Sequence, residues 1–365
     1  MGDKTKIEWA DASWNPIRAR NKATGKVGSH CEHVSPGCEF CYAEKMNMAM
    51  RGYGTGLPFK PGHRKDIEIF LDEKTLLAPI KWKRPRKIFV CSMTDLFADF
   101  VEDRWIDRMV AVMALTPHHT YQILTKRPER MCKYFTKLDE EPIHETIGRI
   151  GDAWPGNHPV PEAGLQIVPM PNVWLGTSCE DGPRAKERIP HLLATPAALR
   201  FVSYEPALGP IKFRYGNDLW YQGGELPEML QVNPVDRASL NALAGVTTWP
   251  GCHYMSPTIP SQHRIIDGHL FESRGENRKI DWIIYGGESG TGRRSSDINW
   301  AVDTMAQCKA EGTKFFFKQD SAHRSGQRGR ASDELWACKE FPDRYVPPEP
   351  PKPEAQAPET EETLL

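Results

Sequence analysis

The chain has 365 residues, of which 39% are hydrophobic and 26% are charged, and its formal net charge is -1. These values are typical of a globular protein with a large core, and they exclude a strongly basic protein that coats nucleic acid. No apolar run is long enough to span a bilayer, and the first residues lack a signal-peptide pattern, so we expect a cytoplasmic protein without membrane contact.

Near the N-terminus, the segment HCEHVSPGCEFCYAEKM (30–46) contains Cys31, Cys38 and Cys41. Disulfide scaffolds are rare in a reducing compartment, and the close spacing therefore indicates that these three thiols ligate a metal. The other six cysteines are interpreted as small buried hydrophobic residues: Cys91, Cys132, Cys179, Cys252, Cys308 and Cys338.

Two kinds of metal centre are compatible with the spacing C-x6-C-x2-C. A structural zinc ion needs four ligands, so His30 or His33 would have to supply the fourth. No second C-x2-C pair and no histidine pair with zinc-finger spacing follows. The alternative is an iron–sulfur cluster held by three thiolates, with one iron open to another ligand.

Downstream, short apolar runs alternate with amphipathic segments. The runs are predicted strands: KIFVCS (87–92), YQILTK (121–126), VWLGTS (173–178), LRFVSYEP (199–206), DWIIYGGESG (281–290) and KFFFKQD (314–320). The amphipathic segments predict helices over 103–115, 182–194 and 297–312. This alternation predicts an α/β fold, a partial (β/α) barrel with about six parallel strands and helices outside.

One barrel domain is predicted over residues 1–342. Residues 137–171 and 213–280 are rich in Pro, Gly and aromatic residues and exceed ordinary connection lengths, so we expect them to be insertions that cover the barrel mouth. The tail, residues 343–365, is rich in Pro and Glu and is predicted to be disordered.

Polar residues follow several of the predicted strands. In a (β/α) barrel the carboxyl ends of the strands form the active site, so we expect these residues to meet there. The alternative for any single cluster is that it caps the next helix. The candidates are Ser92, Thr94, Asp95, Lys126, Ser178, Glu205, Gly286, Gly287 and Glu288.

The segment KWKRPRK (81–87) has five basic residues around Trp82 and leads into a predicted strand. It could form a polyanion-binding patch beside the barrel. A solvated basic face is the more ordinary explanation for such a run.

The cysteine segment resembles the cluster loop of radical S-adenosylmethionine enzymes, because an aromatic residue, Phe40, precedes the last cysteine and Tyr42 and Ala43 follow it. It is most similar to the branch that contains spore photoproduct lyase, where strands ending like SMTDLF (92–97), ILTKRPER (123–130) and VWLGTS (173–178) follow in this order. The whole chain also resembles a family of phage and bacterial proteins with the same motif string.

This resemblance implies a radical S-adenosylmethionine-like barrel and a 4Fe-4S cluster bound by the three cysteines. The common spacing in the superfamily is C-x3-C-x2-C, whereas six residues separate Cys31 from Cys38 here. The turn residues Ser35, Pro36 and Gly37 would allow the extra length to loop out.

The resemblance also implies how S-adenosylmethionine is bound. Phe40 and Tyr42 would flank the cofactor beside the cluster. Lys126, with Arg127 as second candidate, would pair with the cofactor carboxylate. The remaining cofactor contacts would come from Ser92, Thr94, Asp95, Ser178 and Glu205, with Gly286, Gly287 and Glu288 as a binding turn for cofactor or substrate.

The activity implied is the formation of a 5'-deoxyadenosyl radical, with electrons supplied by a donor such as flavodoxin or ferredoxin. The expected substrate is a nucleobase in nucleic acid, DNA in preference to RNA, with a hypermodified thymine of phage DNA as the leading example. Two alternatives stay open: radical chemistry on a peptide or small metabolite, and a non-catalytic nucleic-acid-binding module with a structural zinc ion.

Overall fold

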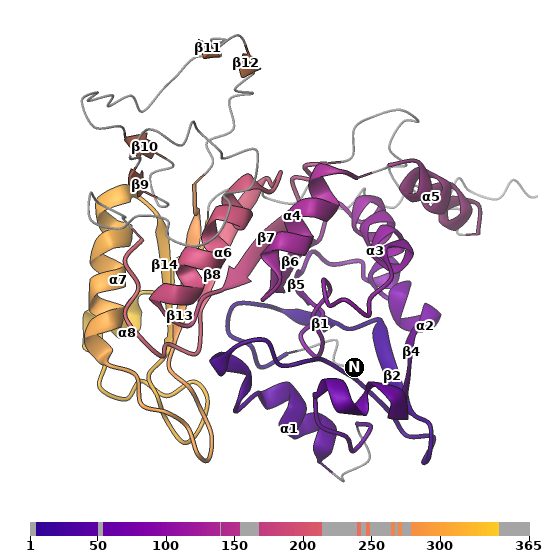
Figure 1. Ribbon diagram of the computed structural model, residues 1–365, viewed down its shortest axis with the longest axis horizontal. Coiled ribbons are helices and arrows are strands. Elements are labelled where there is room, and N and C mark those ends of the chain that lie inside the picture. The colour runs from indigo at the N-terminus through magenta and orange to yellow at the C-terminus, as the bar shows by residue number, and fades with distance from the viewer. Residues whose placement is uncertain are drawn as a thin grey trace, which may run out of the picture.

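The computed structural model describes residues 5–49, 54–138, 140–153, 168–213 and 279–342, together with four short strands between 239 and 271. Its centre is a seven-stranded sheet with the strand order β1-β5-β6-β7-β8-β13-β14. Every neighbouring pair is parallel. Because spatial order follows chain order, each crossover advances in the same direction, and the sheet curls into a half-barrel with helices outside (Figure 1).

The strands of this sheet are β1 (Ala12–Trp14), β5 (Lys87–Val90), β6 (Thr120–Thr125), β7 (Val173–Ser178), β8 (Leu199–Tyr204), β13 (Trp282–Gly286) and β14 (Lys314–Gln319). The six predicted strands and the α/β partial barrel are therefore confirmed. The sequence analysis missed β1, because a three-residue strand with a central serine has no apolar run.

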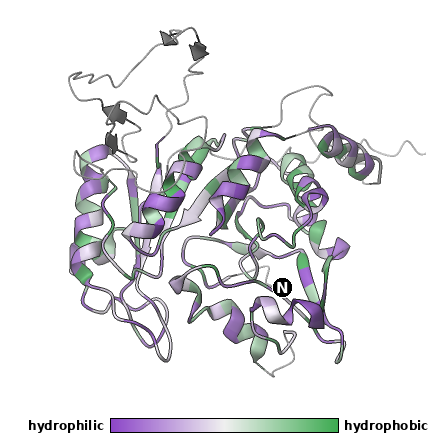
Figure 2. Ribbon diagram, viewed as in Figure 1, coloured by the Kyte–Doolittle hydropathy of each residue, from purple (hydrophilic) through white to green (hydrophobic). Residues whose placement is uncertain are grey.

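The larger helices are α3 (Asp103–Leu115), α4 (Pro128–Thr136), α5 (Glu141–Ala153), α6 (Gly182–Ala194) and α7 (Ile298–Glu311). The three predicted helices are confirmed within one residue at each end. Asp181 caps α6 by accepting from the Arg184 amide, and α7 ends at Gly312, whose φ of 66° suits glycine. Hydrophobic and hydrophilic residues occupy different faces of these helices, as their periodicity requires (Figure 2).

A smaller layer precedes β5 and frames the cysteine segment. It contains the three-stranded antiparallel sheet β3-β2-β4, with β2 (Ile17–Asn21), β3 (Val27–Gly28) and β4 (Ile67–Leu71). Its helices are η1 (Pro36–Cys38), α1 (Tyr42–Met48), η2 (Pro61–Asp66), α2 (Glu73–Leu76) and η3 (Pro79–Lys81), while α8 (Asp333–Ala337) follows β14. Helix α1 begins directly after Cys41.

Aromatic side chains form a second core cluster that is separate from the main hydrophobic core. Trp9, from the segment before β1, packs against Phe89 with ring centroids 4.6 Å apart and against Trp282 at 6.4 Å. Phe201 and Phe316, from β8 and β14, complete this cluster. The N-terminal segment is thus held against strands from both halves of the sheet, below the site at the strand ends.

Both insertions join the sheet at the amino ends of strands. Residues 137–171 directly precede β7, and residues 213–280 directly precede β13. The expectation that they cover the mouth, at the carboxyl ends, stays a prediction. Two short hairpins, β9 (Ser239–Asn241) with β10 (Val246–Thr248) and β11 (Arg264–Ile266) with β12 (His269–Phe271), belong to the second insertion.

Most other residues of both insertions, and the predicted disordered tail, lie outside the described residues. Among the residues that the structure describes, no helix combines the length and the apolar composition needed to cross a membrane.

Candidate functional site

A cavity of about 230 Å³ opens at the carboxyl ends of the sheet strands. The cysteine loop, residues 30–41, forms one wall, and the residues that follow the strands form the other. Twelve of the fourteen predicted site residues line this cavity: Cys31, Cys38, Phe40, Cys41, Tyr42, Ser92, Thr94, Asp95, Lys126, Ser178, Glu205 and Glu288.

The three thiols are free and partly buried, and all of them line the cavity. Burial raises the pKa of Cys31 to about 12, and the Asp95 carboxylate adds to this effect. Burial also raises the pKa of Cys41. A metal binds the thiolate form, so ligation at these two cysteines would require the metal to offset the effect of burial.

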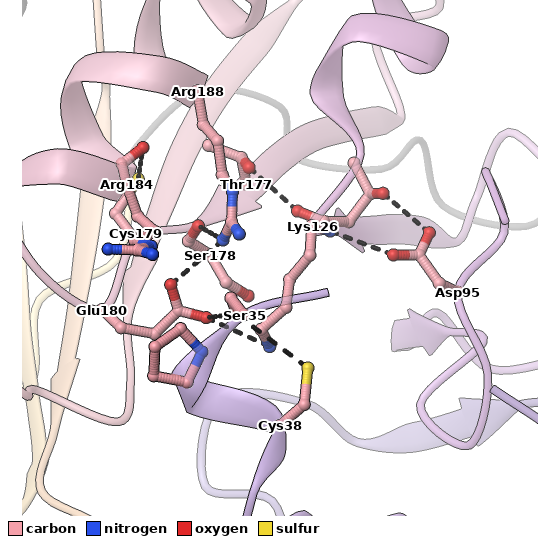
Figure 3. A network of polar contacts seen from close by, with 12 residues as sticks. Ser35, Cys38, Asp95, Lys126, Thr177, Ser178, Cys179, Glu180, Arg184 and Arg188 are labelled. Atoms are coloured by element: carbon pink, nitrogen blue, oxygen red, sulfur yellow. Dashed lines mark hydrogen bonds and ion pairs between the residues drawn. The ribbon is translucent and has the colours of Figure 1, made fainter. Parts of the chain in front are cut away.

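Glu180, which follows β7, anchors the extra residues of the cysteine loop (Figure 3). The Ser35 hydroxyl donates to Glu180 Oε1 at 2.6 Å, and Arg188 Nη1 lies 3.1 Å from Oε2. Gly37 packs directly on this carboxylate, because a Cβ there would lie 2.5 Å from Glu180 Oε1. The serine and glycine between the first two cysteines thus give the loop a fixed position on β7.

Arg294 anchors the same loop from the opposite side of the half-barrel. Glu288, just after β13, holds the Arg294 guanidinium at 2.7 Å, and this guanidinium donates to the Pro36 carbonyl at 2.9 Å. A further ion pair joins Arg294 to Glu39 at 3.0 Å. Glu288 is therefore engaged with protein, and it connects the GGESG segment to the cysteine loop.

Asp95 organises the ends of β5 and β6. Its carboxylate accepts from the Thr125 hydroxyl at 2.7 Å, from the Lys126 amide at 3.0 Å and from Arg127 Nη1 at 3.2 Å. The neighbouring Thr94 hydroxyl donates at 2.5 Å to the carbonyl of the residue before Cys31. Both residues line the cavity, and their hydrogen bonds hold its walls in place.

Lys126 extends from the end of β6 towards the loop (Figure 3). Its ammonium lies 3.8 Å from Glu180 Oε1. Burial lowers its pKa, but the charges of Glu180, Cys38 and Cys41 outweigh burial, and the net pKa is raised. Lys126 is therefore a permanent cation beside two of the thiols.

Two further contacts shape the cavity wall. The Tyr42 hydroxyl donates to the Ser92 carbonyl at 2.7 Å, which connects the start of α1 to the end of β5. Across the cavity, Lys318 on β14 lies 2.5 Å from Glu205, which follows β8. Lys318 and Glu205 give this wall a donor and an acceptor side by side.

Gly286 and Gly287 do not line the cavity, and their role in a binding turn stays a prediction. A Cβ on Gly286 would lie 2.9 Å from the Glu205 carboxyl carbon, and one on Gly287 would lie 2.2 Å from the Ser321 amide. A glycine is needed at both positions because the chain runs close to its neighbours there, and the residues of this turn that line the cavity are Glu288 and Ser289.

The two histidines expected as zinc ligands do not line the cavity. His30 is buried against Phe59 and Phe100, with ring centroids 6.0 and 5.2 Å away. His33 Nε2 lies 3.0 Å from Glu44. Within the described residues, no three His, Cys, Asp or Glu side chains are arranged as ligands of a single metal ion.

The basic run 81–87 lies away from the cavity. It directly precedes and enters β5 at the amino edge, where Arg86 stacks over Trp82 at 4.7 Å and Lys87 over Phe341 at 3.7 Å. The cavity is at the carboxyl edge, after Val90. A polyanion patch formed by this segment would therefore lie at the amino edge of the barrel, away from the cavity.

The sequence analysis did not single out Arg294 and Glu180 as anchors of the cysteine loop or Lys318 as a wall residue. Glu180 and Lys318 stand at strand ends, where position alone could have found them. Arg294 lies six residues after Glu288, and its contacts to Pro36 and Glu39 span more than 250 residues, so no local signal identifies them.

Residues 4–341 match the family model described as "Protein of unknown function (DUF5131)", and the chain belongs to this family. Neither a curated protein nor a solved structure gives a significant match to the chain. Its function is therefore inferred from the fold and the site.

Proposed function

We propose that this member of the DUF5131 family is a radical S-adenosylmethionine enzyme whose cluster is held by Cys31, Cys38 and Cys41, and that it modifies a nucleobase in nucleic acid. The observation that carries the proposal is the convergence of three free thiols on one cavity at the carboxyl edge of a parallel half-barrel. Active sites of (β/α) barrels lie at this edge.

The donor set fits an iron–sulfur cluster better than a single zinc ion. Each thiolate of a cluster binds a different iron atom, so the three sulfurs need not surround one point. A tetrahedral zinc ion would need a fourth ligand, but His33 contacts Glu44 and neither His30 nor His33 lines the cavity that the thiols share. With three protein ligands, one iron stays open to a cofactor.

The cysteine loop is held in place by protein contacts alone, which supports a preformed cluster site. Ser35, Pro36 and Glu39 are bound by Glu180 and Arg294, from two different strand ends. The six-residue gap between the first cysteines therefore has a structural use, and it is compatible with three sulfurs on one cavity wall.

S-adenosylmethionine would occupy the cavity between the thiols and the strand ends. When bound together, cluster and cofactor supply a reductively generated 5'-deoxyadenosyl radical. Lys126 provides a cation for the cofactor carboxylate, and Glu205 provides an acceptor for its amino or hydroxyl groups. The apolar residues Trp9, Phe89 and Leu124 line the same cavity and limit the access of water to its floor.

The test is cofactor cleavage by anaerobically reconstituted protein with dithionite or reduced flavodoxin. We expect release of 5'-deoxyadenosine from S-adenosylmethionine, and we expect the Cys38→Ala variant to abolish it. The matched control is Cys338→Ala, because Cys338 is also free and partly buried but does not line the cavity. Cleavage that is absent from the wild type despite a full complement of iron would refute radical chemistry.

Substrate class is tested separately with the same preparation. Oligonucleotides, a peptide library and nucleosides are each added, and stimulated 5'-deoxyadenosine release is measured. The proposal expects stimulation by DNA or RNA. Stimulation only by peptides or by free metabolites would retain the radical enzyme and reject nucleic acid as its substrate.

A further inference from the structure

We propose that the loops after β13 and β14, together with Lys45 on α1, form a docking surface for the sugar-phosphate backbone of single-stranded or locally opened nucleic acid. This inference rests on the proposed function, and it states where the nucleic acid binds. The surface is defined here as Lys45, residues 289–294 and residues 321–330.

The two loops form one projection beside the cavity. The Gly290 amide donates to the Ala322 carbonyl at 3.1 Å, and the Ala322 amide donates to the Glu288 carbonyl at 3.2 Å. Ser289 and Ala322 form a parallel bridge, so the pairing of β13 with β14 continues beyond the carboxyl edge. Both loops extend below the half-barrel at the lower left of Figure 1.

Buried polar side chains brace this projection from inside. Asp320, which is 1% exposed, accepts from the Arg330 side chain at 2.7 and 2.8 Å and from the Ser321 amide at 2.7 Å. Gln319 accepts from the Ser325 hydroxyl and from the Gly326 amide, each at 2.8 Å. The loop after β14 is therefore a fixed platform that presents its outer side chains in defined positions.

Three cations on this surface have no acidic partner among the described residues: Lys45, Arg293 and Arg324. All three are exposed, and a Cβ on Gly290 would lie 3.6 Å from Lys45 Nζ, so α1 and the projection are contiguous. His323 is exposed beside Arg324, and Arg328 is partly neutralised by the exposed Asp333 at 2.6 Å. Unpaired exposed cations that do not stabilise the fold are typical of phosphate contacts.

An aromatic ring lies between this charge and the cavity. Phe40 lines the cavity and is contacted by Lys45 at 5.3 Å and by Arg294 at 5.2 Å from its centroid. Basic grooves with aromatic rings are the usual means of binding single strands, because every base can stack on a ring. An enzyme that acts on a base must also take it out of the helix. The cations that would bind the backbone come first, Phe40 comes next, and the cavity lies behind it. This arrangement would deliver one unstacked base to the site.

The basic run 81–87 offers an internal comparison. Its exposed residues Lys83 and Arg84 carry the same charge as Arg293 and Arg324 but precede β5, at the amino edge. If overall charge alone bound nucleic acid, both pairs would contribute equally. The docking surface predicts that only the pair at the mouth contributes.

The experiment measures binding of a fluorescein-labelled single-stranded DNA oligonucleotide, and of its duplex, by anisotropy over a series of salt concentrations. The double variant Arg293→Gln with Arg324→Gln is compared with the control Lys83→Gln with Arg84→Gln, and unchanged circular dichroism verifies both folds. We expect weaker binding by the mouth variant only. For the mouth variant, the magnitude of the slope of log affinity against log salt concentration should decrease by about 1.4. Each phosphate contact on a single strand contributes about 0.7 to this magnitude, and the variant removes two such contacts.

Each other outcome contradicts the docking surface. It would be overturned if both variants lost oligonucleotide affinity equally or if only the control lost affinity. It would also be overturned if the affinity of the wild type did not depend on salt. Unchanged oligonucleotide affinity together with slower reduction by acidic flavodoxin would assign the surface to the electron donor. Iron content and 5'-deoxyadenosine release are measured on the same samples, so failure of the radical enzyme proposal is recognised independently of oligonucleotide binding.

Discussion

At the scale of single residues, two charged side chains hold the cysteine loop. Glu180 lies at 0% exposure between Arg188 and Ser35, and Arg294 joins Glu288 to Pro36 and so connects β13 with the loop. Neither contributes a ligand, yet both determine where the thiols lie. Fixing the loop before any cluster binds lowers the conformational entropy that binding must otherwise offset.

Removal of the Ser35 hydroxyl tests this anchoring. Ser35→Ala leaves one lone pair of the buried Glu180 carboxylate without its donor, and we expect the free energy of unfolding to fall by about 1.5 to 3 kcal/mol, as for hydrogen bonds to charged groups. Urea denaturation measures the change. The control is Ser295→Ala, whose exposed hydroxyl makes only a 3.3 Å contact with the Ser296 carbonyl; a similar loss in both variants would show that the Glu180 contact is not special.

His119 provides a prediction for pH. Burial lowers its pKa from 6.5 to about 3, because the ring is enclosed near Trp82 and Tyr121. The unfolded chain binds this proton below pH 6.5 while the folded chain does not, so His119 stabilises the fold above pH 6.5 and loses this contribution as the pH falls towards about 3. The loss is about 1.4 kcal/mol per pH unit.

The measurement compares urea denaturation of the wild type and His119→Gln from pH 7 down to the lowest pH at which the protein stays folded. As the pH falls, the free energy of unfolding of the variant should decrease less than that of the wild type, by about 1.4 kcal/mol for each pH unit. If the free energies of unfolding of the two proteins changed equally with pH, His119 would not take up a proton on unfolding.

At the scale of elements, periodicity predicted six of the seven strands of the half-barrel sheet and three of the larger helices, and it missed α4 and α5. Helices α3, α6 and α7 were predicted within one residue at each end, because their buried faces repeat with helical spacing and Asp181 and Gly312 mark boundaries. The strand β1 and the small sheet β3-β2-β4 were missed, since two to five residues give no clear period.

The GGESG segment shows how little a motif alone says about the surroundings of its glycines. Glycines that permit close packing and glycines that expose backbone to a ligand look the same in a sequence. The structure distinguishes them, because Gly287 faces the Ser321 amide rather than the cavity. Its neighbour Glu288 does line the cavity, as predicted, although its carboxylate holds Arg294.

Substitution of Gly287 tests the packing interpretation. A Cβ at Gly287 would lie 2.2 Å from the Ser321 amide nitrogen, so backbone must move, and we expect Gly287→Ala to destabilise the fold by about 1 to 3 kcal/mol or more. The control Gly62→Ala adds a Cβ that meets nothing within 4 Å, in η2. Thermal unfolding of both variants decides between them: equal melting temperatures would show that Gly287 tolerates a side chain.

At the scale of the whole molecule, the order of alternating strands and helices predicted the half-barrel and the convergence of the site. Parallel strands place their carboxyl ends at one edge, so residues as distant as Ser92 and Glu288 were expected together, and both line the same cavity. The same rule gives the edge at which the insertions and the basic run join the sheet. All of them precede a strand, so they join it at the amino edge.

The central claim is that three thiols at the mouth of this half-barrel hold an iron–sulfur cluster. Iron and acid-labile sulfide analysis of anaerobically reconstituted protein tests it most directly, with Cys38→Ala and the control Cys338→Ala measured in parallel. We predict about four irons and four sulfides per chain in the wild type and the control, as a 4Fe-4S cluster requires, and a large loss in Cys38→Ala. One zinc ion per chain without iron or sulfide would contradict the claim.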